Sequence, residues 1–317
     1  MIMTEASNTK MRDCLPNSDS GGGITAARDG SFPKISIVTP SLNQGEYIEA
    51  TIESVIGQNY PNLEYIVVDG GSQDKTVDII KKYERFISYW ESKKDNGQAS
   101  AINRGFAIAS GDILAWLNSD DMYLPGALHR VAAILSEGQV QSDRIIVFGN
   151  CLHLYQNQFA ARGRNVKYTH QVSNIELCDY IIQPSSFWTR AAFEATGALR
   201  EDLSWSFDWE WFIRAKKRSV LFHPVDDFLS VYRIHSEHKS ESGGYERMHE
   251  LARIYREYHP KKIARAYVKM NTCRSMLNKS KVLKQTKIPG IMAFLMGICC
   301  MCVYRITWRQ VKALWRM

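Results

Sequence analysis

The sequence predicts an α/β protein with a mostly parallel central sheet flanked by helices and a basic, helical C-terminal tail. Its 317 residues, 45% hydrophobic and 23% charged, leave room for one large core. From residue 34 onward, short β-branched runs alternate with segments of helical periodicity, which is typical of a sheet covered on both faces. Basic residues gather near the C-terminus, where they set the last segment apart.

The elements follow from local pattern. The expected strands are short apolar runs rich in β-branched residues, over 35–38, 63–68, 113–117, 145–148 and 185–188. The expected helices have apolar residues three or four apart, over 48–56, 77–83, 98–109 and 209–217, with another from about 245. We therefore expect a disordered leader over 1–33, one α/β domain over 34–240, and a helical, basic region over 241–317.

The charge is unevenly distributed. The net charge is +7, but residues 261–317 hold 13 Lys and Arg and no Asp or Glu, which leaves 27 basic and 33 acidic residues before them. The tail also carries an apolar run over 291–304, about fourteen residues and short of the ~20 that span a bilayer. Basic flanks and tryptophans around such a run favour a helix lying on an anionic membrane surface. The alternative is a helix packed on the body; nucleic-acid binding is disfavoured, because most of the tail lacks interleaved stacking aromatics.

The cysteines exclude two kinds of site. There are seven, with no Cys-x-x-Cys pair, which argues against a zinc ribbon or a thioredoxin-type centre. The N-terminus is polar and has no apolar signal core, so we expect a cytoplasmic body.

Polar clusters follow the first three expected strands. They begin at Pro40 with Ser41, at Asp69, and at Asn118, which leads into Asp120 and Asp121. Because ligands of parallel sheets bind beyond the carboxyl ends of the strands, these clusters predict one site. Adjacent carboxylates suit Mg²⁺ or Mn²⁺, although an Asx turn before the next helix is the plainer interpretation. Asp69 could accept hydrogen bonds from a base or ribose, or cap a glycine turn.

Two further residues are candidates for chemistry. Asp208 lies among aromatic residues in Phe207-Asp208-Trp209-Glu210, where partial desolvation would suit it to general-base work, and it could equally cap the following helix. His235 ends Tyr232-Arg233-Ile234-His235; a lone histidine is more often structural than a metal ligand.

Taken in order, these motifs resemble a known family. They are Ile37-Val38-Thr39-Pro40-Ser41-Leu42-Asn43, Val67-Val68-Asp69-Gly70-Gly71-Ser72, Asp95-Asn96-Gly97-Gln98 with Asn103-Arg104-Gly105, Asn118-Ser119-Asp120-Asp121, Gln183-Pro184-Ser185, Asp208-Trp209-Glu210-Trp211 with Arg214, and Tyr232-Arg233-Ile234-His235. The region from about 34 to 240 resembles the inverting family 2 glycosyltransferases of the GT-A fold, including WcaA-like enzymes of cell-surface polysaccharide synthesis.

The resemblance implies a role for each matching position. Asp208 would be the catalytic base. Metal ligands would be Asp121 and, as an additional one, His235. Nucleotide-sugar contacts would come from Pro40, Ser41, Asp69, Asp95, Asn103 and Asp120. Many members have a second Asp that contacts uracil where this sequence has Gly70, so the resemblance leaves the base open.

The implied function is sugar transfer with inversion from a nucleotide-diphosphate donor, with a UDP-sugar expected first. The acceptor would be a glycan or a lipid-linked hydroxyl, and Mn²⁺ or Mg²⁺ the cofactor. Surface-polysaccharide or glycolipid synthesis at the cytoplasmic face of the cell membrane would be the setting, with no nucleic acid as partner. The rival hypothesis is a catalytically silent nucleotide-sugar-binding or scaffold protein of the same fold. A nucleotidyltransferase would share the sheet and the carboxylates but would leave Asp208 and the 232–235 motif unexplained.

Overall fold

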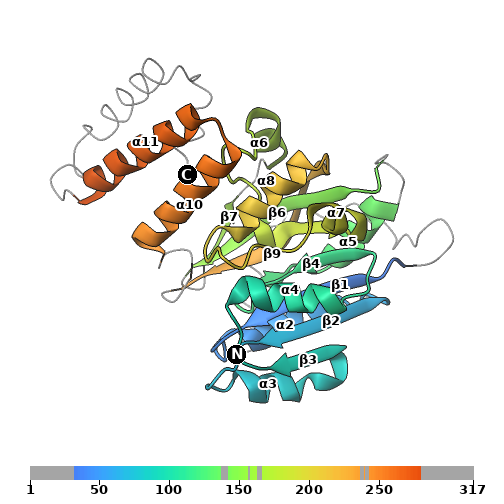
Figure 1. Cartoon of the computed structure of the whole chain (residues 1–317). Helices are drawn as coiled ribbons and strands as arrows, with labels where there is room; N and C mark the ends of the chain where they lie inside the picture. The colour runs from blue at the N-terminus through green and yellow to red at the C-terminus, as the bar shows by residue number, and fades with distance from the viewer. Residues whose placement is uncertain are drawn as a thin grey trace. The chain divides into compact units, whose positions relative to one another are not determined.

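A computed structural model describes residues 32–136, 142–155, 158–162, 166–235, 239 and 243–279 (Figure 1). Most of the expected leader and the tail beyond 279, with its apolar run, lie outside these residues. The described chain forms two compact units, one of residues 32–169 with 181–235 and one of 170–180 with 239–279.

The first unit is built on one mixed sheet. Its strands are β1 (Ile35–Ser41), β2 (Leu63–Asp69), β3 (Tyr89–Ser92), β4 (Ile113–Trp116), β5 (Met122–Tyr123), β6 (Ile145–Tyr155), β7 (Gln158–Arg162), β8 (Ser186–Thr189) and β9 (Leu221–Ile234). The order is β3-β2-β1-β4-β8-β6-β9-β5, with β7 paired to β6. Strands β2, β1 and β4 run parallel, as the sequence predicts, and β3 adds a fourth parallel strand, so all four bring their carboxyl ends to one edge.

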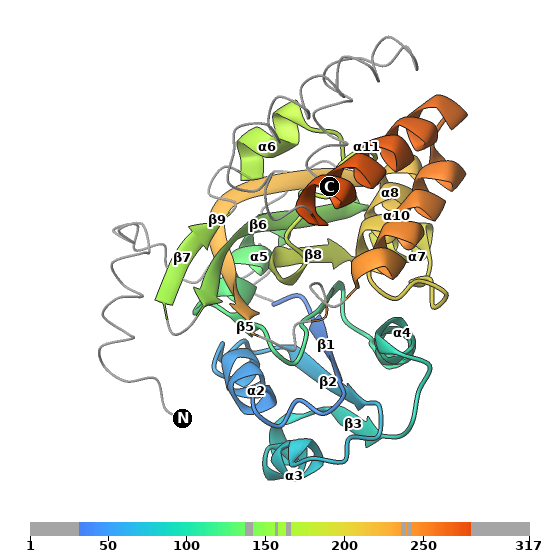
Figure 2. The ribbon, with the colours of Figure 1, turned by 90° about the vertical axis from the view of Figure 1, so that its left-hand side faces the viewer.

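Helices connect and cover these strands. They are α2 (Ile48–Ile56), α3 (Thr76–Lys82), α4 (Gln98–Ile108), α5 (Ala127–Ser136), α6 (Val166–Val172), α7 (Arg190–Thr196), α8 (Phe207–Lys217), α10 (Gly244–Tyr258) and α11 (Lys261–Lys279), with short 3₁₀ turns at Glu84–Phe86 and Gln183–Ser185. Helices α2 and α4 lie on opposite sides of β1 and β2 (Figure 2). That arrangement explains why β1 is buried along its whole length.

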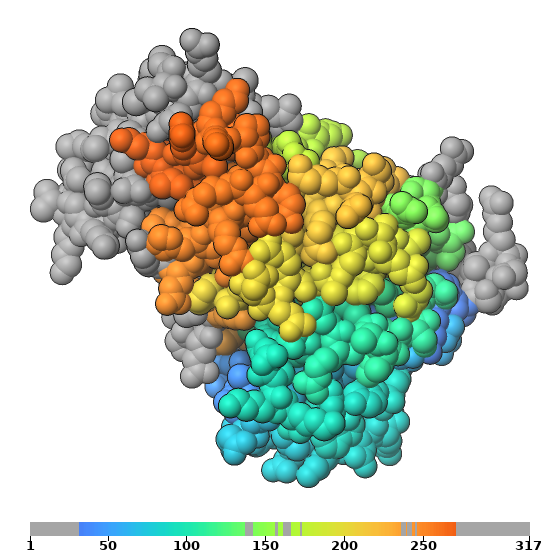
Figure 3. Space-filling model, in the orientation of Figure 1, coloured from blue at the N-terminus to red at the C-terminus, as the bar shows by residue number. Residues whose placement is uncertain are grey.

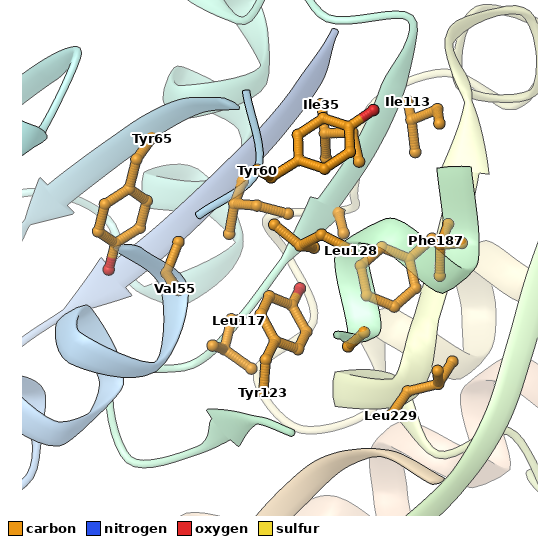
Figure 4. Close-up of a cluster of buried hydrophobic side chains, with 14 of the residues drawn as sticks. Ile35, Val55, Tyr60, Tyr65, Ile113, Leu117, Tyr123, Leu128, Phe187 and Leu229 are labelled. Carbon is orange, nitrogen blue, oxygen red and sulfur yellow. The ribbon is translucent and has the colours of Figure 1, made fainter. Parts of the chain in front are cut away.

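The main core fills the space between the sheet and α2 and α5. Ile35 and Ile113 of neighbouring strands meet Val55 of α2 and Leu128 of α5, and all four are almost fully buried (Figure 4). The alternate residue Val38 faces α4, where Gly105 allows close approach: a Cβ at 105 would lie 2.4 Å from Val38 Cγ1. The β-branched residues of β1 thus pack against helices on both faces of the sheet, as expected for a central strand.

The second unit is helical in its described part. Tyr255 of α10 stacks on Tyr267 of α11, with ring centroids 4.2 Å apart, and its hydroxyl donates to the Leu177 carbonyl (2.7 Å). Among the described residues, no helix combines the length and the apolar character needed to cross a bilayer.

The structure extends the predicted pattern at several points. Strand β2 reaches Asp69, β6 continues to Tyr155, and α8 begins at Phe207. Strands β3, β5, β7 and β9 have no counterpart among the predicted elements. Strand β9 alternates polar and apolar residues irregularly around register shifts opposite Asn150, so its sequence lacks a clean period of two.

Candidate active site

The loops after β1 and β2 are joined at the carboxyl edge of the sheet. Ser41 and Asp69 are register partners, and the Gly70 amide donates to the Ser41 carbonyl (2.8 Å). Asn43, at a φ of 51° that Asn tolerates better than most residues, has its backbone N–H 2.7 Å from Ser72 Oγ. Pro40 and Ser41 therefore lie at the carboxyl edge of the sheet, and their contacts with a nucleotide stay a prediction.

Asp69 is fully buried and its carboxylate is engaged by the loops around it. Oδ2 accepts from the backbone N–H groups of Gly71 (3.0 Å) and Ser72 (2.8 Å) and from the Ser92 hydroxyl (2.6 Å), and Oδ1 accepts from the Ser72 hydroxyl. Of the two interpretations of Asp69, this geometry supports the glycine-turn cap. A direct contact to base or ribose stays a prediction.

The Asp120-Asp121 pair lies in a turn after β4. The Asp121 N–H donates to the Asn118 carbonyl (3.1 Å), and the hydroxyl of Thr51 in α2 reaches the carbonyls of Ser119 (2.9 Å) and Asp121 (2.7 Å). Strand β5 follows at once and the next helix begins only at Ala127. The pair therefore does not cap that helix, and the plainer interpretation of the motif is wrong.

Asp121 is a buried carboxyl group beside a second one. Burial, first, and the charge of Asp120, second, hold the pKa of Asp121 well above its usual 3.8, against a hydrogen bond from the Arg233 backbone N–H to Oδ1 (3.2 Å). A cation here would offset both costs of ionising Asp121. In the described chain no three His, Cys, Asp or Glu side chains gather closely enough to bind a metal by themselves. The set suits an ion such as Mg²⁺, which takes one or two carboxylates and completes its shell with phosphates and water.

The residues at the end of β9 and just after it contact this pair. His235 Nε2 lies 3.1 Å from Asp120 Oδ2, so His235 contacts the carboxylate that precedes Asp121 in the motif. The ring of Tyr47, at the start of α2, lies 4.3 Å from that of His235, and the Arg233 guanidinium lies 5.1 Å from the Tyr47 ring centre. Metal ligation by His235 stays a prediction. Tyr47 and Arg233 belong to the site although sequence reasoning gave them no role.

Side-chain amides link the loops around Asn118. Gln98 Nε2, at the start of α4, donates to Asn118 Oδ1 (2.8 Å), and Asn118 Nδ2 lies 3.4 Å from Asp121 Oδ2. Gln183 Nε2 donates to the Trp116 carbonyl (2.9 Å). All three amides stand in the motifs named above, so their positions in those motifs were the available signal.

Asp95 and Asn103 occupy different settings. Asp95 lies beside Gly70: a Cβ at 70 would be 3.1 Å from Asp95 Oδ2. Asn103 in α4 instead pairs with the backbone of Leu199, donating from Nδ2 to its carbonyl (2.9 Å) and accepting its N–H at Oδ1 (2.8 Å). In Figure 3 the residues around 199, in yellow, border those of α4, in teal. This geometry gives Asn103 a positioning role, and its donor contact stays a prediction.

Asp208 and Glu210 diverge because they lie on a helix. Asp208 is in the first turn of α8 and half-exposed, and Ser206, not Asp208, is the N-cap. Glu210 is fully buried and accepts two hydrogen bonds from Arg214 (3.1 and 3.0 Å). The Phe207 ring lies 6.2 Å from that of Trp116, so the start of α8 is near the carboxyl end of β4.

The sequence is similar to those of known proteins. Residues 36–194 match the model of glycosyl transferase family 2. An uncharacterized glycosyltransferase of Rickettsia prowazekii is 29% identical over 212 residues, 64% of this chain and 65% of that protein. One of Rickettsia typhi is 35% identical over 116 residues, 37% of this chain and 36% of its own length. The matches thus span from about a third to two thirds of these relatives.

Solved structures share the fold. TarS 1-349 of S. aureus, in complex with UDP-GlcNAc, superposes with a TM-score of 0.55 at 16% identity, over 78% of this chain and 74% of that one. The mannosyltransferase PcManGT from Pyrobaculum calidifontis, in complex with GDP-Man and Mn²⁺, gives a TM-score of 0.58 at 15% identity, over 98% and 90%. With the family match over half the chain, this protein belongs to glycosyl transferase family 2 and has a GT-A type α/β fold.

Proposed function

We propose that this glycosyltransferase moves a sugar from a nucleotide-diphosphate donor to a hydroxyl acceptor with inversion, using Asp208 as base. The observation that carries the proposal is the buried Asp121 carboxyl group beside Asp120 in the turn after β4, together with the half-exposed Asp208 in the first turn of α8. Asp208 follows Phe207, whose ring lies 6.2 Å from that of Trp116 at the end of β4. The two solved neighbours hold UDP-GlcNAc and GDP-Man, which supports a nucleotide-sugar donor.

The residues have separate tasks. Asp208 would accept the proton of the acceptor hydroxyl. The oxygen of that hydroxyl bonds to the anomeric carbon as the bond from that carbon to the diphosphate breaks. A single displacement inverts the configuration at that carbon. Asp121 and Asp120 would hold a divalent cation, with His235 beside Asp120; when bound, that ion neutralises the charge growing on the diphosphate. Mn²⁺ in the PcManGT complex supports this assignment.

Two substitutions test these tasks. Asp208→Asn should retain donor binding and lose about 10²–10⁴-fold in transfer. Asp121→Ala should lose Mn²⁺- or Mg²⁺-dependent nucleotide binding. A screen of nucleotide-sugars with each metal, measuring donor hydrolysis, identifies the donor for both assays. Full activity of purified Asp208→Asn would refute the base assignment, and metal-dependent binding without any turnover in the wild type would favour the silent scaffold.

The setting we propose is surface-polysaccharide or glycolipid synthesis on the cytoplasmic side of the membrane, as in WcaA-like enzymes. A Bacillus subtilis relative, 36% identical over 110 residues, has a name that refers to teichuronic acid biosynthesis. The described part of the C-terminal region exposes Lys261, Lys262 and Arg265 on α11, which supports attraction to anionic lipids. Liposome flotation of the full chain against a variant lacking 281–317 tests this: unchanged flotation would reject membrane binding by the tail.

A further inference from the structure

The loop after β3 lies directly on the glycine pair that follows β2. The Lys93 N–H donates to the Asp69 carbonyl (2.9 Å), and a Cβ at Gly71 would lie 3.2 Å from the Lys94 nitrogen. Gly71 has a φ of 89°, in the left-handed region that favours glycine, whereas Gly70 is not among the positive-φ glycines of the described chain. The backbone conformation at 70 therefore does not require glycine, and the reason for a glycine there lies in a neighbouring side chain.

That neighbour is the carboxylate of Asp95. Its three outer atoms would lie 3.1–3.3 Å from a Cβ at 70, tighter than ordinary van der Waals contact. Oδ1 accepts the Gly97 backbone N–H (2.8 Å), which orients the group. Within the described chain no hydrogen-bond donor contacts Oδ2, and Asp95 is half-exposed. One oriented acceptor oxygen is thus available at the edge of the sheet.

The position of this oxygen relative to Asp121 limits what it can contact. Strands β2 and β4 both pair with β1, so their ends are two strand spacings apart, about 10 Å. As proposed above, Asp120 and Asp121 hold the metal and the diphosphate of the donor. The part of the donor that reaches the end of β2, two strands away, is then the nucleoside. The Gln98–Asn118 hydrogen bond ties the start of α4, next to the Asp95 loop, to the Asp121 turn, which keeps the two ends in a fixed relation.

We propose that Asp95 selects the base of the donor by accepting the N3–H of uracil at Oδ2, and that Gly70 leaves the space that its carboxylate needs. This inference rests on the proposed function and deepens it. Uracil presents a ring N–H at N3, whereas cytosine presents a lone pair at the same atom. Guanine also presents a ring N–H, at N1, so titration with GDP separates these two bases. A site built around an acceptor that demands a donor discriminates strongly against a base without one.

Calorimetric titration with UDP, CDP and GDP in the presence of Mn²⁺ tests the proposal on the full chain. Wild type should bind UDP at least about tenfold more tightly than CDP. Asp95→Asn should weaken UDP binding by about tenfold and change CDP binding by less than about threefold. The control Asp78→Asn, an exposed carboxylate on α3, should match wild type. Circular dichroism spectra establish that each variant is folded.

A transplanted carboxylate makes the test sharper. Gly70→Asp alone should weaken UDP binding, because two carboxylates then compete for one space. The double variant Gly70→Asp/Asp95→Ala should recover the preference for UDP over CDP. An unchanged UDP-to-CDP ratio in Asp95→Asn, equal weakening of both nucleotides, or tighter binding of GDP than of UDP by wild type would each overturn the proposal. Wild type that binds no nucleoside diphosphate with Mn²⁺ would refute the proposed function as well.

Discussion

Replacing Glu64 with Gln should make the stability of the first unit far less sensitive to acid. Glu64 lies in β2, and its side chain is 13% exposed. Oε1 accepts from Lys34 Nζ and Ser110 Oγ (both 2.7 Å), while Oε2 accepts from Ser36 Oγ (2.5 Å) and the Ser110 N–H (2.6 Å). This one carboxylate therefore joins β1, β2 and the loop that leads into β4, below the strand ends that form the site.

The size of the effect follows from the pKa. Burial acts to raise the pKa of Glu64, but the hydrogen bonds from Lys34, Ser36 and Ser110 outweigh it and lower the pKa from 4.5 to about 2. Since one pKa unit corresponds to about 1.4 kcal/mol, and Lys34 is partly exposed and screened, the charged form contributes roughly 2–3 kcal/mol to the free energy of unfolding. A depressed pKa means that this contribution is present above pH 4.5 and is lost as the pH falls from 4.5 towards 2.

Urea denaturation of wild type and Glu64→Gln between pH 7 and pH 3 measures this. We expect the variant to be less stable by roughly 2–3 kcal/mol at neutral pH, because an amide cannot accept from all four donors. The difference should shrink steadily below pH 4.5 as the wild-type carboxylate is protonated. The exposed Glu84→Gln serves as control, with a change within about 0.5 kcal/mol. A difference for Glu64→Gln that is equal at pH 7 and pH 3 would refute the reasoning.

Two further predictions concern packing and the segment before α8. Gly105→Ala should lower the free energy of unfolding by about 1–3 kcal/mol, because the new Cβ would overlap Val38, and by less than about 0.5 kcal/mol in a Val38→Ala background. Urea denaturation measures both changes, and equal losses in the two backgrounds would contradict this reasoning. Arg214→Lys should destabilise by about 1–3 kcal/mol, because a lysine cannot bond Glu210 and the carbonyls of Thr196 (2.7 Å) and Ala198 (2.8 Å) at once. The exposed Arg218→Lys is the matched control, and equal thermal shifts of the two variants would show that the fork of Arg214 has no special role.

Local sequence determined the parallel half of the sheet and one edge of the site. The β-branched runs of β1, β2 and β4 alternate with helical periodicity, and only a parallel arrangement joins such strands through helices. Because the carboxyl ends of parallel strands lie at one edge of the sheet, the sequence alone predicts that Ser41, Asp69 and Asp121 lie near one another. The ordered motifs were sufficient to identify the family.

Tertiary structure alone decided what each polar side chain does. The Asp69 carboxylate accepts hydrogen bonds from the loops around it. Asn103 forms hydrogen bonds with a backbone 96 residues away, and His235 contacts Asp120, which is 115 residues away in the sequence. Whether Asp208 and Glu210 face together or apart depended on helix α8 starting at Phe207. Periodicity encodes burial and element type, since these depend on near neighbours. A hydrogen-bond partner depends on which distant loops the closed sheet brings together, and no local pattern carries that information.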